Sequence, residues 1–135
     1  MSIESWDPNI AEQQASYQLD REFLLNIIGI RQKEPNREVS DYFTTDEKQK
    51  HSAMMKLDRQ TWLETTADFE TEQLLSLIEF LTLAEMKIPS WEVGAESPVI
   101  HIVKFLRQRK TPPSKEILLW IKANSSNRFL PNGAL

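Results

Sequence analysis

The segment that decides the fold runs from Glu70 to Lys87 and reads ETEQLLSLIEFLTLAEMK. Its nine apolar residues lie on most sides of a helical wheel, and a thin polar line through Glu72, Ser76 and Glu79 interrupts them. A helix that is apolar around most of its circumference has to be surrounded by other elements that shield it from water. We therefore place this segment in the middle of a bundle, ending before Pro89, whose ring disfavours helical continuation.

Helical periods continue on the N-terminal side of this segment. Apolar residues recur at spacings of three and four from about Ile10 to Glu34, and Pro35 ends that pattern. The quartet TTDE at residues 44–47 has the composition of a capping box, in which threonine and glutamate bond each other's backbone N–H groups. Apolar spacing after the capping box is loose, so residues 45–66 are compatible with one helix or with two.

Two more helices are predicted on the C-terminal side. Ser97 is a candidate N-cap, and the proline after it suits the first helical position, so a helix is predicted over residues 98–110. The turn TPPS at residues 111–114 separates it from a short helix that runs from Lys115 to about Asn124. Almost no strand-like alternation occurs along the chain, which points to an all-helical fold.

The sequence thus predicts an all-α protein, a single compact bundle of four to five helices over residues 1–135. An N-terminal arm is expected at residues 1–9. A polar, partly ordered C-terminal tail is expected at residues 125–135, which are rich in asparagine, serine and proline.

Composition excludes several kinds of active site. The chain has no cysteine, so disulfides, thiolate zinc sites and cysteine nucleophiles are ruled out. Its two histidines, His51 and His101, belong to no metal-binding pair of the H-x-x-x-H or E-x-x-H type. Three glycines cannot form a glycine-rich phosphate loop. We predict no catalytic residue, no metal and no cofactor, and we expect the protein not to be an enzyme.

The apolar segments are too short to predict a membrane protein. The longest apolar block, residues 23–30, is much shorter than the roughly 20 residues that cross a bilayer. The N-terminal stretch MSIESWDP lacks the basic and apolar regions of a signal peptide. Together with the lack of cysteine, which fits a reducing compartment, these features predict a cytoplasmic protein with no membrane partner.

Charge is distributed unevenly along the chain, whose net charge is −4. Residues 1–96 contain 19 acidic and 9 basic residues, a net charge of −10. Residues 97–135 contain one acidic residue, Glu116, against seven basic ones, a net charge of +6. Such asymmetry suggests an anionic partner for the basic end. The candidate anion-binding or nucleic-acid-binding residues are Lys104, Arg107, Arg109, Lys110, Lys115, Lys122 and Arg128.

The basic end has two interpretations. Clustered lysine and arginine bind a phosphate backbone by releasing its counterions, and two helices joined by a tight turn resemble a helix-turn-helix superficially. Against this, the second helix offers few side chains for base edges, and its turn has two prolines where that motif prefers glycine. The alternative is that the basic helices neutralise the acidic ones within the fold or across a dimer.

Large apolar side chains supply candidate partner-binding residues. Met54 and Met55 lie near Trp62 in the sequence, and flexible thioethers can form an adaptable groove or simply fill the core. Trp91 stands in the connection before Ser97, where it either plugs the end of the bundle or anchors a partner. Both interpretations stay open at this stage.

The tail supplies further polar candidates. Asn124, Asn127 and Arg128 could form a cluster that recognises a carboxylate or phosphate. Alternatively, the asparagines cap the last helix while Phe129 and Leu130 pack the tail against the body.

From these features we expect a non-catalytic binding or regulatory module that acts through protein–protein interaction, including self-association. The alternative function is a nucleic-acid-associated protein that uses the basic C-terminal helices.

Overall fold

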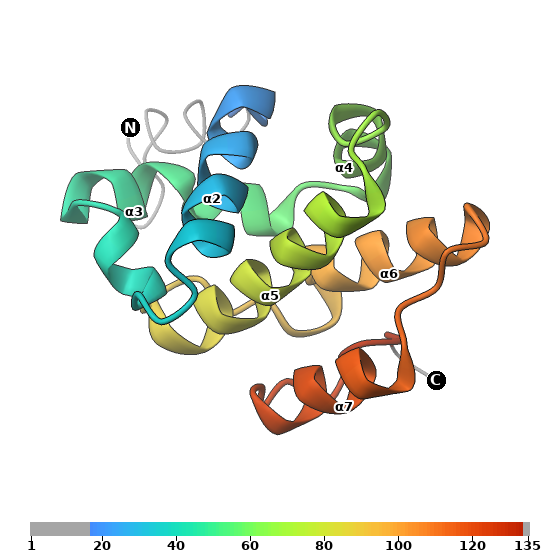
Figure 1. Ribbon diagram of the computed structural model, residues 1–135. Coiled ribbons are helices and arrows are strands. Elements are labelled where there is room, and N and C mark those ends of the chain that lie inside the picture. The colour runs from blue at the N-terminus through green and yellow to red at the C-terminus, as the bar shows by residue number, and fades with distance from the viewer. Residues whose placement is uncertain (1–16, 134–135) are drawn as a thin grey trace, which may run out of the picture.

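The computed structural model describes residues 17–133, which form six α-helices, three short 3-10 helices and no β-strand (Figure 1). The α-helices are α2 (Arg21–Lys33), α3 (Thr45–His51), α4 (Arg59–Thr65), α5 (Thr71–Lys87), α6 (Pro98–Gln108) and α7 (Lys115–Ala123). The 3-10 helices are η1 (Val39–Tyr42), η2 (Ser52–Lys56) and η3 (Gly94–Glu96). The predicted all-α fold is confirmed, with one α-helix more than the four to five expected. The arm predicted at residues 1–9 lies outside the described residues, as do the last two residues of the predicted tail.

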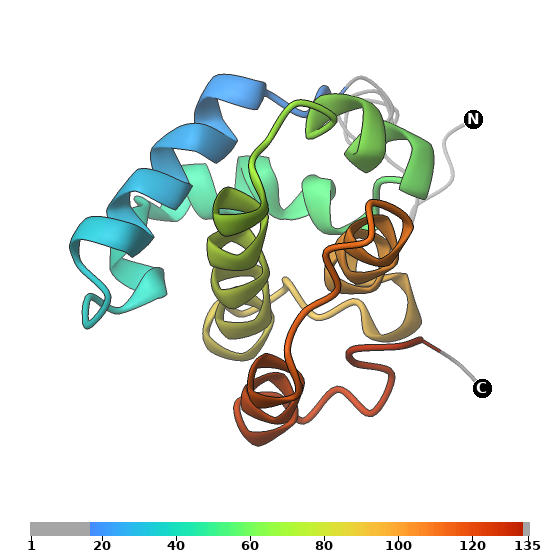
Figure 2. The ribbon, with the colours of Figure 1, turned by 45° about the vertical axis from the view of Figure 1, so that its right-hand side comes forward.

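Helix α5 lies at the centre of the fold, as its sequence predicts. It packs against α2, α6 and η1, while α4 packs on α6 (Figures 1 and 2). The polar line on α5 is partly covered by α2: Glu72 is exposed, whereas Ser76 and Glu79 contact side chains of α2. The Ser76 hydroxyl accepts a hydrogen bond from Gln32 Nε2 at 3.2 Å, and Glu79 Oε1 lies 3.1 Å from Arg31 Nε. Polar contacts therefore hold α2 along the one side of α5 that has no apolar side chains.

The predicted helix boundaries depend on local chemistry that the structure confirms. Thr44 and Glu47 form a complete capping box at the start of α3, with bonds of 3.2 and 2.7 Å. Ser97 caps α6 by accepting from the Val99 backbone N–H at 3.2 Å, and Pro98 occupies the first turn. Helices α2 and α5 both end two residues before a proline. This agrees with the clash between a proline ring and the preceding residue, which disfavours the helical conformation of that residue.

Two boundaries differ from the expectation or were left open. The first described helix begins at Arg21 and residues 17–20 are not helical, because the Asp20 carboxylate caps the helix by accepting from Glu22 N–H at 3.0 Å. The part of the predicted helix at residues 10–16 lies outside the described range. Residues 45–66 form two α-helices separated by η2, and Asp58 caps the second by accepting from Thr61 N–H at 2.9 Å.

The C-terminal tail folds back on the body after α7. It returns beneath α6 in Figure 2, and α7 itself lies at the lower edge of both views, on the far side of the molecule from α3 and α4. Ser126 N–H contacts the Met86 sulfur at 3.2 Å, and Leu130 is buried. Gly133 has a φ of +90° and approaches Ile100 so closely that a Cβ atom would lie 3.3 Å from Ile100 Cγ2. The described part of the tail therefore packs against the body at several points, while Ser126, Arg128 and Asn132 are exposed.

The central position of α5 gives a direct stability test. Leu81 is completely buried in α5, so Leu81→Ala should lower the free energy of unfolding by about 2–5 kcal/mol through lost burial and an internal cavity. The matched control is Leu119→Ala in α7, because Leu119 is 56% exposed and its truncation should change stability by less than about 0.5 kcal/mol. Urea unfolding followed by circular dichroism measures the free energy of unfolding of both variants. Equal losses of stability would contradict the central position of α5.

Candidate functional site

The seven basic candidates lie on four segments of the chain and have different neighbours. Lys104 and Arg107 belong to α6, Arg109 and Lys110 to the turn after it, Lys115 and Lys122 to α7, and Arg128 to the tail. Within residues 17–133, no carboxylate lies within 4.0 Å of any of these seven bases. The basic end is therefore not neutralised by direct ion pairs within the described part of the chain.

Three of these bases are held by contacts within the fold. Arg109 Nη1 donates to the Phe69 carbonyl at 2.7 Å, which ties the end of α6 to the α4–α5 connection. Arg107 Nη2 donates to Asn132 Oδ1 at 2.6 Å. The Arg128 guanidinium lies 5.0 Å from the centre of the Phe129 ring. These three arginines contribute to packing. The two lysines of α7 make no such contact among the described residues.

The solvent side of α7 carries a short stripe of one large apolar and two basic side chains, with the exposed acid Glu116 next to it. Lys115, Leu119 and Lys122 are spaced by four and three residues, which places them on one face of the helix. All three are exposed, and Leu119 is 56% accessible. The opposite side of α7 is buried through Ile121. We call Lys115, Leu119 and Lys122 the α7 stripe.

Four of the predicted partner-binding residues lie in the core. Met54, Met55, Trp62 and Trp91 are all completely buried. Trp62 Nε1 donates to the Met54 carbonyl at 3.1 Å, and Trp91 Nε1 donates to the Lys48 carbonyl at 2.9 Å. Of the two interpretations that the sequence left open, core packing is correct. The prediction that these four side chains bind a partner is wrong, because they are not on the surface of this fold. An indole N–H needs a partner when it is buried, and here backbone carbonyls supply it.

Asn124 and Asn127, the remaining partner-binding candidates, have different roles. Asn124 Nδ2 donates to the Trp120 carbonyl at 2.8 Å, which caps the end of α7. Asn127 Nδ2 lies 3.1 Å from both carboxylate oxygens of Glu85 and 2.9 Å from the Gly94 carbonyl. Its Oδ1 accepts from Phe129 N–H at 2.9 Å. Asn127 therefore recognises a carboxylate, but the carboxylate belongs to the same chain.

Glu85 is the polar residue that sequence reasoning missed. It interrupts the apolar run of α5 and is 4% exposed. Its Oε2 accepts from the backbone N–H groups of Val93 at 2.9 Å and Gly94 at 3.1 Å, in addition to Asn127. A buried carboxylate is costly unless donors satisfy it, and here donors from the 93–94 loop and from the tail converge on it. The only sequence sign of this role was an acid placed where the helix should be buried.

A hollow of about 300 Å³ lies between the end of α5 and the tail. It is lined by Glu85, Met86, Glu92, Gly94 and residues 126–129, so two carboxylates stand against the one guanidinium of Arg128. Met86 is 43% exposed here, and Phe129 is half-buried. We call this the tail hollow.

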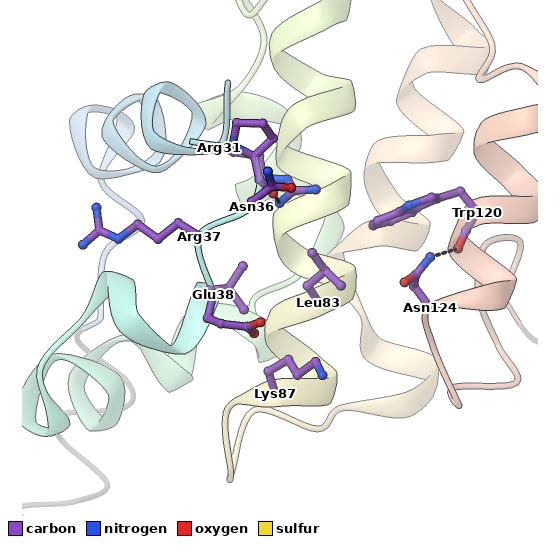
Figure 3. Close-up of a pocket in the computed structure, with 10 residues that line it drawn as sticks. Arg31, Asn36, Arg37, Glu38, Leu83, Lys87, Trp120 and Asn124 are labelled. Carbon is purple, nitrogen blue, oxygen red and sulfur yellow. Dashed lines mark hydrogen bonds between the residues drawn. The ribbon is translucent and has the colours of Figure 1, made fainter. Parts of the chain in front are cut away.

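A second hollow of about 300 Å³ lies between the end of α2, α5 and α7 (Figure 3). Its lining side chains include two cations, Arg31 and Lys87, the carboxylate of Glu38, and the apolar groups of Leu83 and Trp120. We call this the α5–α7 hollow. The guanidinium of Arg37 points away from it in Figure 3, because it bonds Glu34 and the Asp41 carbonyl.

The two histidines lie outside both hollows. His51 stacks on Phe23 with 3.8 Å between ring centres, and its Nδ1 shares a 2.7 Å hydrogen bond with the Tyr17 hydroxyl. Burial lowers the pKa of His51, with a smaller contribution from Lys50, and burial raises the pKa of Tyr17 to about 12. Burial likewise lowers the pKa of His101, helped by its neighbours Arg59 and Lys104.

Between residues 17 and 133, no group of three or more histidine, cysteine or acidic side chains is placed to hold a metal ion. None of the helices described has both the length and the apolarity that a bilayer crossing requires.

Comparisons with protein-family models, with curated proteins and with solved structures found no match to this chain.

The bond between Asn127 and Glu85 predicts a specific loss of stability. Asn127→Ala removes the side-chain donor that bridges Glu85 to the tail and should lower the free energy of unfolding by about 1–3 kcal/mol, because a buried acceptor loses its partner. Asn132→Ala is the control, since Asn132 is exposed and its bond to Arg107 should contribute less than about 1 kcal/mol. Guanidinium unfolding compares the two, and similar losses would refute the importance of Asn127.

The lowered pKa values of the histidines predict how stability depends on pH. Below about pH 6.5 an unfolded histidine becomes protonated, while the folded His51 and His101 stay neutral until lower pH. The unfolded state then binds more protons, so the free energy of unfolding should fall as pH drops from 7 towards 5. Replacing both histidines by glutamine should reduce that fall in urea unfolding. The hypothesis fails if imidazole proton resonances of the wild type titrate at or above 6.5.

Proposed function

We propose that this chain is a non-catalytic helical binding module that acts through protein–protein interaction, with a second copy of itself as the partner. The observation that supports this is the α7 stripe, in which an exposed leucine lies between two lysines on a helix of an otherwise acidic chain. Neither lysine has a carboxylate within 4.0 Å in the described range, so both charges are available to a partner. Such a stripe fits an apolar surface that is flanked by carboxylates.

The tail hollow offers a surface of that complementary kind on the same molecule. Met86 is the other large apolar side chain that is exposed among residues 17–133, at 43%, and it shares the lining of the tail hollow with Phe129 and Glu92. A leucine side chain is small enough to enter a hollow of about 300 Å³. Burial of Leu119 against Met86 and Phe129 would supply apolar contact. Attraction between the lysines of one copy and the glutamates of the other would orient the two copies.

Symmetry favours this arrangement for a homodimer. In a two-fold dimer each contact occurs twice, so the stripe of one copy can meet the hollow of its partner and the reverse. Two such contacts double the buried surface without any further specialised residue. The small size of each contact implies a weak dimer, with micromolar affinity or weaker. A cytoplasmic location remains a prediction from the short apolar segments and the N-terminal sequence pattern, with which the lack of cysteine is compatible.

Nucleic-acid binding is the second candidate function. The seven C-terminal bases favour it, because none is neutralised by an ion pair in the described structure. Three of them, however, already contact carbonyl, amide or aromatic groups within the fold. Fewer bases are then free to neutralise phosphates, and affinity follows the number of phosphates neutralised.

Association is tested by multi-angle light scattering over a wide range of protein concentration. We expect a concentration-dependent dimer in the wild type and at least an about tenfold weaker dimer in Lys115→Glu/Lys122→Glu. Leu119→Ala should also weaken it, because it removes the apolar contact. The charge-matched control is Lys56→Glu/Lys110→Glu, which makes the same change in net charge at exposed lysines outside the α7 stripe and should leave association unchanged.

Two outcomes would overturn the proposal. A monomer at every concentration excludes self-association. Equal weakening by the stripe and control variants would mean that net charge, rather than the α7 stripe, governs association. Retention on an immobilised oligonucleotide that falls steeply with salt, in a chain that stays monomeric, would favour the nucleic-acid function instead.

A further inference from the structure

Met86 differs from the other methionines that the structure describes in its exposure to solvent. Met54 and Met55 are completely buried, whereas Met86, in the last turn of α5, is 43% exposed. The chain has no cysteine, whose thiolate would otherwise compete for oxidants. Among residues 17–133, Met86 therefore carries the sulfur atom that an oxidant in solution reaches most readily.

The Met86 sulfur is also a point of attachment for the tail. Ser126 approaches it with two donors, the backbone N–H at 3.2 Å and the hydroxyl oxygen at 3.3 Å. Ser126 follows Met86 by 40 positions, so these contacts join the end of α5 to the tail that returns after α7. A thioether sulfur is a weak acceptor, so a change in its chemistry changes where and how strongly Ser126 is held.

Hydrogen peroxide converts such a thioether into a sulfoxide. A lone pair of the sulfur takes up one peroxide oxygen as the O–O bond breaks. The proton of that oxygen passes to the departing hydroxide, so one molecule of water leaves. The sulfur loses two electrons and the peroxide gains them. The product is polar and chiral, and methionine sulfoxide reductases reverse the reaction with thiols as the reductant.

The new oxygen does not fit between the sulfur and Ser126. An N–H···O hydrogen bond needs about 2.7–3.2 Å between its heavy atoms, and Ser126 N is already 3.2 Å from the sulfur itself. An oxygen bonded on that side would be too close to Ser126 N, so the tail would have to move away from Met86. An oxygen bonded on another side leaves the tail in place but adds a strong acceptor to the surface of Met86. In both cases the lining of the tail hollow becomes more polar.

A more polar lining acts against self-association, and this step rests on the proposed function. In the proposed dimer, Leu119 of one copy packs on Met86 and Phe129 of the other. A sulfoxide oxygen that is buried under leucine loses water without gaining a donor, which costs free energy. The carboxylates of Glu85 and Glu92 in the same lining are acceptors and supply no donor either.

We propose that Met86 is a reversible oxidation site, at which hydrogen peroxide forms a methionine sulfoxide that makes the tail hollow polar and weakens self-association. The oxidation itself follows from the exposure of Met86 and does not depend on a dimer. Only its effect on association rests on the proposed function.

Peroxide treatment followed by peptide mass spectrometry tests the site itself. We expect Met86 to be oxidised at least about tenfold faster than Met54 and Met55, whose burial keeps peroxide away. Met1, outside the described residues, is read in a separate peptide. Methionine sulfoxide reductases with dithiothreitol should restore the original mass at Met86. In proton–nitrogen NMR, oxidation should shift the amide resonance of Ser126, and peroxide-treated Met86→Leu should show no such shift.

Light scattering before and after peroxide treatment tests the effect on association. We expect oxidation of the wild type to weaken the dimer at least about tenfold, because a polar group replaces an apolar contact. Met86→Leu is the matched control. It keeps an apolar side chain of similar volume, so it should stay folded and associate as the wild type does, without any response to peroxide.

The two measurements fail in different ways. Equal oxidation of Met86 and of the two buried methionines overturns the site. Preferential oxidation of Met86 with unchanged association, or equal weakening of Met86→Leu by peroxide, overturns the effect on the dimer. A chain that is monomeric before treatment contradicts the proposed function and, with it, that effect. The oxidation rates and the Ser126 shift still decide in that case whether Met86 is the oxidation site.

Discussion

The burial of α5 is the constraint on which the rest of the structure depends. Its apolar side chains cover most of its circumference, so α2, α6 and η1 must all pack on it to keep them from water. The same helix carries Glu85, whose buried carboxylate requires donors from outside the helix. The 93–94 loop and Asn127 supply them, so that satisfying one acid positions both the loop before α6 and the tail after α7.

Local chemistry made most of the helices predictable from the sequence. The prolines at 35 and 89, the capping box at residues 44–47 and the Ser97–Pro98 start act within a few residues, so their effect is visible without any tertiary structure. The carboxylate of Asp20 also acts locally, but the apolar period continues past it towards the N-terminus, and for that reason the start of α2 was misplaced. The loose period over residues 45–66 reflects the turn of η2, which breaks the helical repeat.

The candidate sites were harder to predict because they depend on contacts between distant residues. Asn127 and Glu85 are 42 positions apart, and no short-range sequence pattern predicts their hydrogen bond. The same holds for the α5–α7 hollow, which is lined by residues as distant in the sequence as Arg31 and Trp120. Composition did identify the charge asymmetry, and it placed the lysines of the α7 stripe among the candidates. Composition could not distinguish these lysines from the arginines that pack within the fold. The difference lies in hydrogen-bond partners such as the Phe69 carbonyl, which only the folded structure brings close.

The central functional claim is that the exposed face of α7 and the tail hollow are the surfaces through which the module meets its partner copy. Amide hydrogen exchange at low and at high protein concentration tests it most directly, since it locates protection along the chain. The account predicts that α7 and the segments around Met86 and Phe129 exchange more slowly at high concentration, while α2 and α3 are unchanged. Protection confined to α2 or α3, or identical exchange at both concentrations, would contradict it.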